Sequence, residues 1–395
     1  MSDTVSALSH HPALTRGREH LDRTDARTLE WQTAISETPA PTGREQARGA
    51  KVSGLLREIG LTSVSTDHVG NVIAWWGPAD RAPVVVAAHL DTVFGPDVDV
   101  SVRRDGPRLV GPGITDNARG LAGMLALGDV IASGQWTTAK PIAFVATVGE
   151  EGAGDLRGVR HLFGERKFAA DSVIVLDGAN DDRVVHGGLG CRRYRFTFRG
   201  PGGHSWAAFG VPNPAHAAGA LAQAVADLPR AETPRTACSV VGIGGGTSFN
   251  SIPEEAWVEI DLRSEGAAPI EEIERVLRAA ARRGLDRENA RKTPGSRALD
   301  LSVAVIGDRP AGVTPANHPL VQAGLDATRA VGKRLALATA STDANIPISL
   351  GIPAIALGAG GRAGETHSAT EWFENTDGPA GIFRALLVLA AASGL

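Results

Sequence analysis

Cysteine is scarce in this sequence, and long apolar runs are absent. Only Cys191 and Cys238 occur among 395 residues, and neither belongs to a CxxC pair. The chain therefore offers neither a disulfide framework nor a thiolate zinc site, and two free thiols in a reducing cytosol are expected. No segment approaches the roughly 20 apolar residues of a membrane span, and the N-terminal stretch lacks the apolar core of a signal peptide. We expect a cytoplasmic protein.

An excess of charge of one sign is also lacking. The formal net charge is −4 at pH 7, which gives no electrostatic reason to expect nucleic acid or an anionic membrane as partner. A small molecule of little charge is the expected partner.

The first half of the chain alternates between strand and helix patterns. A length of 395 residues favours two domains. Two helices are predicted between about Asp25 and Ile59, broken at 37–43, and another over 117–133. Apolar runs predict strands at 71–75, 84–89, 142–148, 172–177 and 353–358. This alternation predicts an α/β fold with a mostly parallel sheet flanked by helices.

The pattern changes at Gly187 to Gly190. The order becomes strand, helix, strand, strand, helix, strand, which is typical of a ferredoxin-like α+β domain. We predict an inserted domain over 189–305, with residues 1–188 and 306–395 forming the catalytic, metal-binding domain.

A His-x-Asp pair, His89 and Asp91, follows the apolar run of the strand predicted at 84–89. Parallel sheets present their chemistry just beyond such strand ends, so this pair predicts a metal hydrolase. Polar side chains follow other strands or begin the 117–133 helix, and they are expected to converge with His89. These are Asp116, Glu150, Glu151, Asp177 and His367.

Two histidines and several carboxylates without cysteine suit Zn²⁺, and also Co²⁺ or Mn²⁺. We predict two metal ions that share Asp116 as a bridging ligand. His89 and Asp177 would bind one ion, and Glu151 and His367 the other. Asp91 would accept the second ring N–H of His89 and fix its tautomer.

Glu150 and Glu151 are adjacent acids after an apolar strand. Consecutive residues of an extended segment point to opposite sides, so one can bind metal while the other acts as general base. We assign the base to Glu150 and the ligand to Glu151. A single His or Asp at a strand end is more often a helix cap or a solvated loop residue. Doubled glutamates are common on exposed helices, but Glu150 and Glu151 follow an apolar strand and precede glycines, where a solvated helical face is not expected.

Taken in order, these residues resemble the M20 metallopeptidase family, which includes peptidase T, glutamate carboxypeptidase, desuccinylase and aminoacylase. The resemblance extends over nearly the whole chain and includes further segments, namely ETPAPTG, RGPGGHSW, FNSIPEEAWVEIDLR, GDRPAG and STDAN. It implies the same ligand assignments, a cis peptide between Asp116 and Asn117, and a lid domain that often forms a homodimer interface.

The resemblance also implies substrate-binding residues in the lid. His204 matches a histidine that donates to the scissile carbonyl oxygen, sometimes across the dimer. Asn250 and Arg263 match polar positions that hold the substrate, although Arg263 equally suits an ordinary salt bridge with Glu259 or Asp261. Arg362 is a weaker candidate for carboxylate binding.

Asp177 separates branches of the family, because peptidase T and carnosinase-like dipeptidases have aspartate where other members have glutamate. The resemblance therefore favours an aminopeptidase or dipeptidase acting on a small peptide. An N-acyl-amino-acid deacylase or carboxypeptidase is the alternative, and a non-catalytic dimeric binding protein is a remote one.

Overall fold

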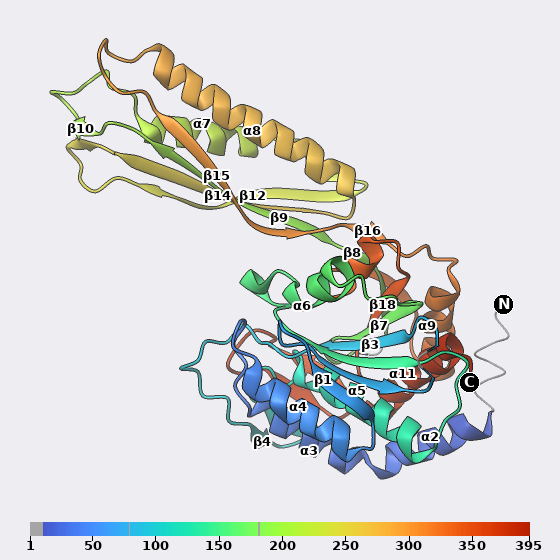
Figure 1. Cartoon of the computed structure of the whole chain (residues 1–395). Coiled ribbons are helices and arrows are strands. Elements are labelled where there is room, and N and C mark those ends of the chain that lie inside the picture. The colour runs from blue at the N-terminus through green and yellow to red at the C-terminus, as the bar shows by residue number, and fades with distance from the viewer. Residues whose placement is uncertain (1–10, 79, 181) are drawn as a thin grey trace. The chain divides into compact units, whose positions relative to one another are not determined.

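The computed structural model describes residues 11–78, 80–180 and 182–395. The chain divides into two compact units (Figure 1). Unit 1 comprises Met1–Gly188 and Val313–Leu395, and unit 2 comprises Leu189–Gly312. The predicted inserted domain, 189–305, ends before unit 2 does, because the last strand of this unit continues to Arg309.

Unit 1 is built on a nine-stranded mixed sheet. From one edge, its strands are β1 (Thr62–Thr66), β2 (Val72–Trp76), β6 (Ile142–Thr147), β3 (Val84–His89), β7 (Ser172–Leu176), β18 (Ala354–Leu357), β8 (Arg183–Gly188) and β16 (Gly312–Val313), with β17 (Ala336–Ala340) also on β8. The four central strands, β6, β3, β7 and β18, run parallel. The predicted mostly parallel α/β sheet is thus confirmed.

Both faces of this sheet are covered, as the continuous apolar character of β3 predicts. Val84 and Val86 pack into a cluster with Leu121 of α5, while Val85 and Ala87 pack into a second cluster on the other face. The first face is covered by α2 (Pro12–Arg23), α4 (Gln46–Glu58), α5 (Ala118–Ser133), α9 (Pro319–Ala330) and α11 (Gly378–Ser393). The second is covered by α10 (Asn345–Ser349) and the turns α6 (Arg157–Val159) and η2 (Arg160–Glu165).

The predicted pair of N-terminal helices is present as α3 (Asp25–Ser36) and α4, with the break where the prolines stand. Helix α2 was not predicted. It begins at Pro12, a residue suited to a first helical position, and buries Leu14 and Leu21. Among the described helices, none is both long and apolar enough to cross a membrane.

A small four-stranded sheet lies at the edge of unit 1. Its strands, in order, are β19 (Arg362–Gly364), β20 (Trp372–Glu374), β5 (Arg108–Val110) and β4 (Arg103–Asp105). The loop between β19 and β20 carries His367, and the segment after β5 leads to Asp116. The pairing of β20 with β5 therefore brings together two parts of the site that are far apart in the sequence.

Unit 2 has the predicted element order: β9 (Gly190–Arg199), α7 (Pro214–Ala226), β12 (Arg235–Gly245), β14 (Glu255–Ser264), α8 (Ala267–Ala290) and β15 (Asp300–Arg309). The sheet is antiparallel, with β11 (Ala231–Glu232) at one edge and the order β11-β12-β14-β9-β15. Phe196 and Phe198 of β9 pack with Leu221 and Leu277 of the two helices. This unit therefore has its own core. A further short pair, β10 (Gly203–His204) and β13 (Ser251–Ile252), completes it.

Arg48 of α4 is fully buried and fixes the N-terminal break to the central sheet. Its guanidinium donates to the carbonyl oxygens of Thr38 (2.9 Å), Leu90 (2.9 Å) and Ser36 (3.2 Å). The Leu90 carbonyl lies between His89 and Asp91, so this side chain links the fold to the start of the site.

Replacing Arg48 with methionine should lower the free energy of unfolding by about 3 kcal/mol, because three buried carbonyl oxygens lose their donor. Urea denaturation of the variant measures the change. Arg44→Met, at an exposed position just before the same helix, is the control. A loss below about 1 kcal/mol for Arg48→Met would show that the three hydrogen bonds contribute little.

Candidate metal centre

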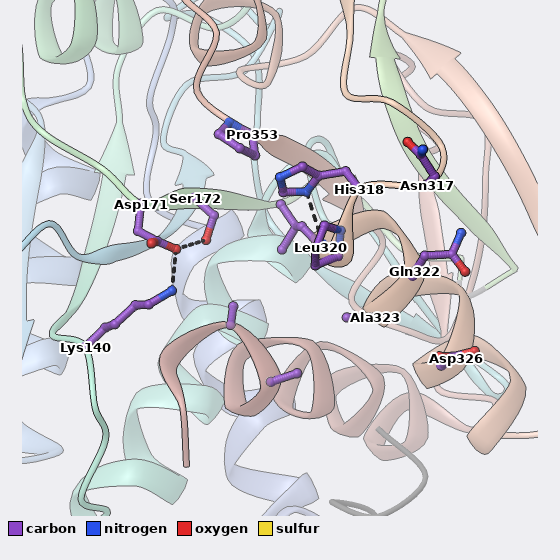
Figure 2. A pocket seen from close by; sticks show the side chains of 13 residues that line it. Lys140, Asp171, Ser172, Asn317, His318, Leu320, Gln322, Ala323, Asp326 and Pro353 are labelled. Atoms are coloured by element: carbon purple, nitrogen blue, oxygen red, sulfur yellow. Dashed lines mark hydrogen bonds and ion pairs between the residues drawn. The ribbon is translucent and has the colours of Figure 1, made fainter. Parts of the chain in front are cut away.

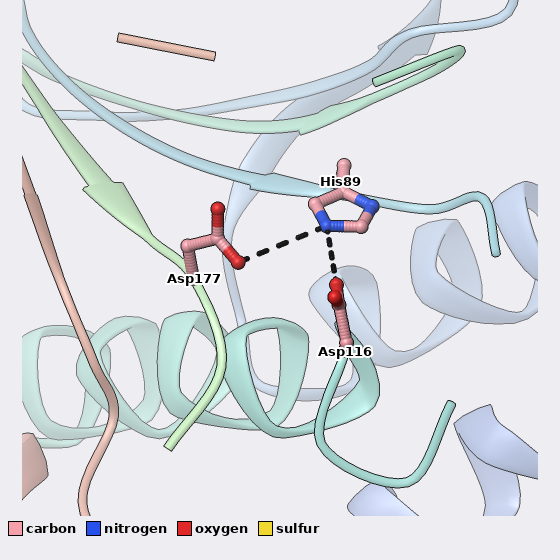
Figure 3. Close-up of side chains that lie close together, drawn as sticks. All are labelled: His89, Asp116 and Asp177. Atoms are coloured by element: carbon pink, nitrogen blue, oxygen red, sulfur yellow. Dashed lines mark ion pairs between the residues drawn. The ribbon is translucent and has the colours of Figure 1, made fainter. Parts of the chain in front are cut away.

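Several of the predicted site residues come together at the carboxyl ends of parallel strands, and Figure 3 shows three of them, His89, Asp116 and Asp177. His89 is the last residue of β3, Asp177 follows β7, and Glu150 and Glu151 follow β6. Asp116 comes from the turn before α5. Because β6, β3 and β7 are parallel neighbours, these side chains reach a common edge, as expected from the sequence.

Asp116 lies between two histidines. Its Oδ1 is 2.9 Å from His89 Nε2, and its Oδ2 is 3.1 Å from His367 Nε2. Asp177 Oδ1 lies 3.9 Å from His89 Nε2, and Glu151 Oε1 lies 3.0 Å from His367 Nε2. Each oxygen of one carboxylate thus faces a separate pair made of one histidine and one further acid.

These contacts define two groups whose ligand atoms all lie within 4.8 Å of one another. One is His89, Asp116 and Asp177, and the other is Asp116, Glu151 and His367. Glu150 belongs to a third such group with His89 and Glu151. The structure therefore brings together every metal-ligand residue predicted from the sequence, together with the predicted base.

The turn before α5 is tied to the end of β7. Asn117 caps α5 by accepting from Gly120 N (3.1 Å), and its side-chain amide donates to Leu176 O (2.9 Å). A Cβ at position 120 would lie 2.5 Å from that same carbonyl oxygen, so only glycine fits. The bond between Asp116 and Asn117 is cis, as the resemblance implied.

Asp91 orients His89 as predicted, but through its main-chain oxygen and not through the carboxylate that the sequence suggested. The Nδ1 of His89 donates to the main-chain oxygen of Asp91 (3.0 Å), while the carboxylate Oδ1 lies 3.6 Å away, beyond an ordinary hydrogen bond. The carboxylate instead accepts from Glu150 N and Glu151 N, both at 2.9 Å, and from the Thr42 hydroxyl at 2.9 Å. Asp91 therefore fixes both the imidazole and the backbone of the two glutamates.

The clustered acids perturb one another strongly. Burial, together with the nearby charge of Asp116, raises the pKa of Asp177 to about 7 and also raises the pKa of Glu151. Burial works against the ionised form of Asp116 too, but hydrogen bonds from His367 and His89 hold its pKa well below its usual range. The hydrogen bond with Asp116 raises the pKa of His367 to about 9. Protons on these side chains partly neutralise a site that is short of positive charge.

This donor set fits two divalent cations. Imidazole nitrogens and carboxylate oxygens suit Zn²⁺, Co²⁺ or Mn²⁺, and a shared carboxylate is the usual bridge between paired ions. Two cations would also offset the burial and the repulsion from Asp116 that together raise the pKa of Asp177 and of Glu151.

The remaining predicted residues belong to unit 2 or to other elements of unit 1. His204 and Asn250 belong to unit 2, on β10 and just before β13. Arg263 of β14 donates from Nε to Asp261 Oδ2 (2.8 Å), which is the ordinary salt bridge that the sequence allowed. Arg362 opens β19 in unit 1 and is exposed. The roles of these four residues towards a substrate stay predictions.

Sequence reasoning missed one residue at the site. Glu371 is completely buried and accepts from the backbone of Thr115 and Asp116. The only available signal was a carboxylate four positions after His367 and next to two aromatic residues, where an exposed acid is not expected.

A separate cavity of about 350 Å³ lies at the other end of the central strands (Figure 2). Ser172 begins β7 and Pro353 precedes β18, so both lie at the amino ends of their strands. Lys140 and Asp171 form an ion pair of 2.8 Å at its wall. The metal-ligand residues lie at the carboxyl ends, and this cavity is therefore no part of the candidate centre.

The sequence profile of Peptidase family M20/M25/M40 matches residues 85–390. The chain belongs to this family. It is thus a metal-dependent peptidase or amidohydrolase of the M20 type, as the motifs indicated. A search of curated proteins gave no match.

Solved structures with the same fold span nearly the whole chain. An aminopeptidase PepT from Bacillus cereus is 19% identical, with a TM-score of 0.76, covering 93% of this chain and 98% of that one. A tripeptidase from Staphylococcus aureus is 20% identical, with a TM-score of 0.77 and coverages of 94% and 99%. The YXEP protein from Bacillus subtilis, described as a dinuclear metal binding peptidase, is 14% identical, with a TM-score of 0.69 and coverages of 95% and 100%.

Zinc binding to the metal-free protein should tighten as the pH rises, because metal and protons compete for the same atoms. His367, with a pKa of about 9, is protonated at neutral pH and must release that proton. Between pH 6.5 and 8 the affinity should therefore rise about tenfold or more per pH unit, measured by titration calorimetry. His367→Ala should show a shallower slope. An affinity independent of pH would contradict the assignment of His367 as a ligand.

Proposed function

We propose that this protein is a two-metal exopeptidase, an aminopeptidase or dipeptidase, that uses zinc to hydrolyse an amide bond of a small peptide. The observation that carries the proposal is the position of Asp116, whose two oxygens face two separate histidine and carboxylate pairs. His89 and Asp177 would hold one ion, and Glu151 and His367 the other. Ions held by these residues would lower the pKa of the attacking water and polarise the scissile carbonyl.

Glu150 is proposed as the general base. Its side chain is buried, and a carboxylate oxygen lies within 4.8 Å of ligand atoms of His89 and Glu151. Its main-chain N–H is held by Asp91 Oδ1 at 2.9 Å, which limits movement of the loop. Glu150 would take the proton of the attacking water and deliver it to the leaving amine.

His204 is proposed as the donor to the scissile carbonyl oxygen. Its Nδ1 accepts from Trp206 N (3.2 Å) and from Ala207 N (3.4 Å). A neutral imidazole that accepts at Nδ1 carries its proton on Nε2, so the outer nitrogen of this exposed ring is a donor. That tautomer supports the stabilisation of an oxyanion. Asn250 lies beside it, since Ser205 N donates to Asn250 O.

The preference for a free amino terminus rests on Asp177 as the acidic ligand beside His89. The similar structures from Bacillus cereus and Staphylococcus aureus are described as an aminopeptidase and a tripeptidase, which supports the same choice. A deacylase or carboxypeptidase using the same residues is the alternative.

A homodimer through unit 2 is part of the proposal. The structure describes all of this unit. The short strand β11 pairs with β12 only up to Thr236, and after that residue β12 pairs with β14 on one side and with no named strand on the other. Its side chains Val241 and Ile243 are 64% and 56% exposed. An open edge with exposed apolar side chains supports pairing with a second copy.

Glu150→Ala should abolish nearly all turnover, with kcat reduced by about a thousandfold, while the zinc content per chain stays unchanged. The reason is that the base is lost while all five proposed ligands remain. Steady-state assays combined with metal analysis of the purified variant test this. Glu365→Ala, at an exposed acid on the β19–β20 loop, should keep both activity and metal. An active Glu150→Ala enzyme would remove Glu150 from the mechanism.

A paired panel of substrates separates the proposal from its alternative. The zinc-loaded protein should hydrolyse free dipeptides and tripeptides at least about a hundredfold faster, in kcat/KM, than the same peptides with an acetylated amino group. The reason is that a substrate site that binds a free amino terminus rejects an acetylated one. The reverse order would identify a deacylase or carboxypeptidase. Less than one metal ion per purified chain, without hydrolysis of either class, would favour a non-catalytic binding protein.

A further inference from the structure

Glu371 is a buried carboxylate that contacts no ligand atom of the candidate centre but holds the backbone that carries one. Its Oε1 accepts from Thr115 N (2.7 Å), from Asp116 N (2.9 Å) and from the Thr115 hydroxyl. Its Oε2 accepts from Gly113 N (3.3 Å). One side chain therefore satisfies three backbone N–H groups of the turn that presents Asp116.

The same loop supplies His367. The segment between β19 and β20 turns through hydrogen bonds from Ser368 N to Glu365 O and from Glu371 N to Ser368 O, both at 3.1 Å. His367 Nε2 reaches the carboxylate of Asp116 on one side, and Glu371 reaches its main-chain N–H on the other. Asp116 is consequently held at both its side chain and its backbone by residues four positions apart.

Burying the carboxylate of Glu371 costs free energy, which its hydrogen bonds to the turn must offset. Burial raises the pKa of Glu371, although its hydrogen bonds with Thr115 and Asp116 oppose that rise, and the negative charge of Asp116 lies nearby. An apolar side chain would avoid the cost of a buried acid but would leave the three N–H groups without an acceptor. The carboxylate fits a requirement for one fixed backbone conformation at Asp116.

We propose that Glu371 is a positioning residue that orients Asp116 so that its two oxygens face the two histidine and carboxylate pairs. It acts through the backbone of Thr115 and Asp116 and does not touch the reacting atoms. The proposal rests on the proposed two-metal site, because the orientation matters only if each oxygen of Asp116 must face a different histidine and carboxylate pair.

The test measures binding of Zn²⁺ alone to the metal-free protein by titration calorimetry, so no catalytic assay is involved. Glu371→Ala should weaken zinc binding about 10- to 100-fold, the usual effect of removing a group that orients a ligand. Glu371→Gln should recover most of the affinity, remaining about three- to tenfold weaker than the native protein, because an amide oxygen can still accept from Thr115 and Asp116. Glu374→Gln, on the adjoining strand and paired instead with Arg108, is the matched control.

The absorption spectrum of the Co²⁺-loaded proteins gives a second readout, since it reports the geometry of the ligands rather than the stability of the fold. Glu371→Ala should change the spectrum, while the control should not. Native affinity and an unchanged spectrum in Glu371→Ala would overturn the proposal.

If Glu371→Ala does not fold, as judged by circular dichroism, Glu371→Asp decides, because its shorter side chain keeps the charge but cannot reach the turn in the same way, and native affinity in that variant overturns the role. A native protein that binds two zinc ions while Glu371→Ala binds them equally well would refute only this inference. A native protein that binds none would refute the proposed metal centre as well.

Discussion

The candidate centre depends on one shared carboxylate. Asp116 approaches both histidines, at 2.9 Å and 3.1 Å, through different oxygens. A carboxylate that is to bridge two ions through separate oxygens needs both of them directed at once. The backbone around Asp116 therefore matters as much as its side chain, which explains why the turn before α5 is held by Asn117, by Gly120 and by Glu371.

Two buried acids around the centre share a common design. Asp91 accepts from the N–H groups of Glu150 and Glu151, and Glu371 accepts from those of Thr115 and Asp116. Each fixes a loop that carries candidate ligands, and neither belongs to the proposed ligand set. Backbone N–H groups partly compensate the charge of both acids, and the buried guanidinium of Arg48 acts on the same pair. Asp91 and Glu371 thus have hydrogen-bond donors of their own and can hold the ligand loops without binding a metal ion themselves.

The chain separates its proposed tasks between two units with separate cores. Unit 1 provides all the candidate metal ligands and the proposed base. Four of them stand at or just after the ends of parallel strands, whereas Asp116 comes from the turn before α5 and His367 from the β19–β20 loop. Unit 2 provides His204 and Asn250 near the short β10–β13 pair. Placing ligands at strand ends gives a precise geometry, because each loop begins from a strand whose position is fixed by burial on both faces.

The sequence by itself determined the α/β class of unit 1, the element order of unit 2 and the identities of the clustered residues. It could do so because apolar runs and turn residues are local signals, and because polar residues at the ends of parallel strands must share one edge of a sheet. Only the tertiary structure decided how these residues are supported. Glu371 is 255 positions from Asp116, and the Nδ1 of His89 reaches the main-chain oxygen of Asp91 rather than its carboxylate. The contact of Glu371 arises from packing between distant segments. The Asp91 carboxylate likewise accepts from the distant N–H groups of Glu150 and Glu151, which a local pattern of residues does not encode.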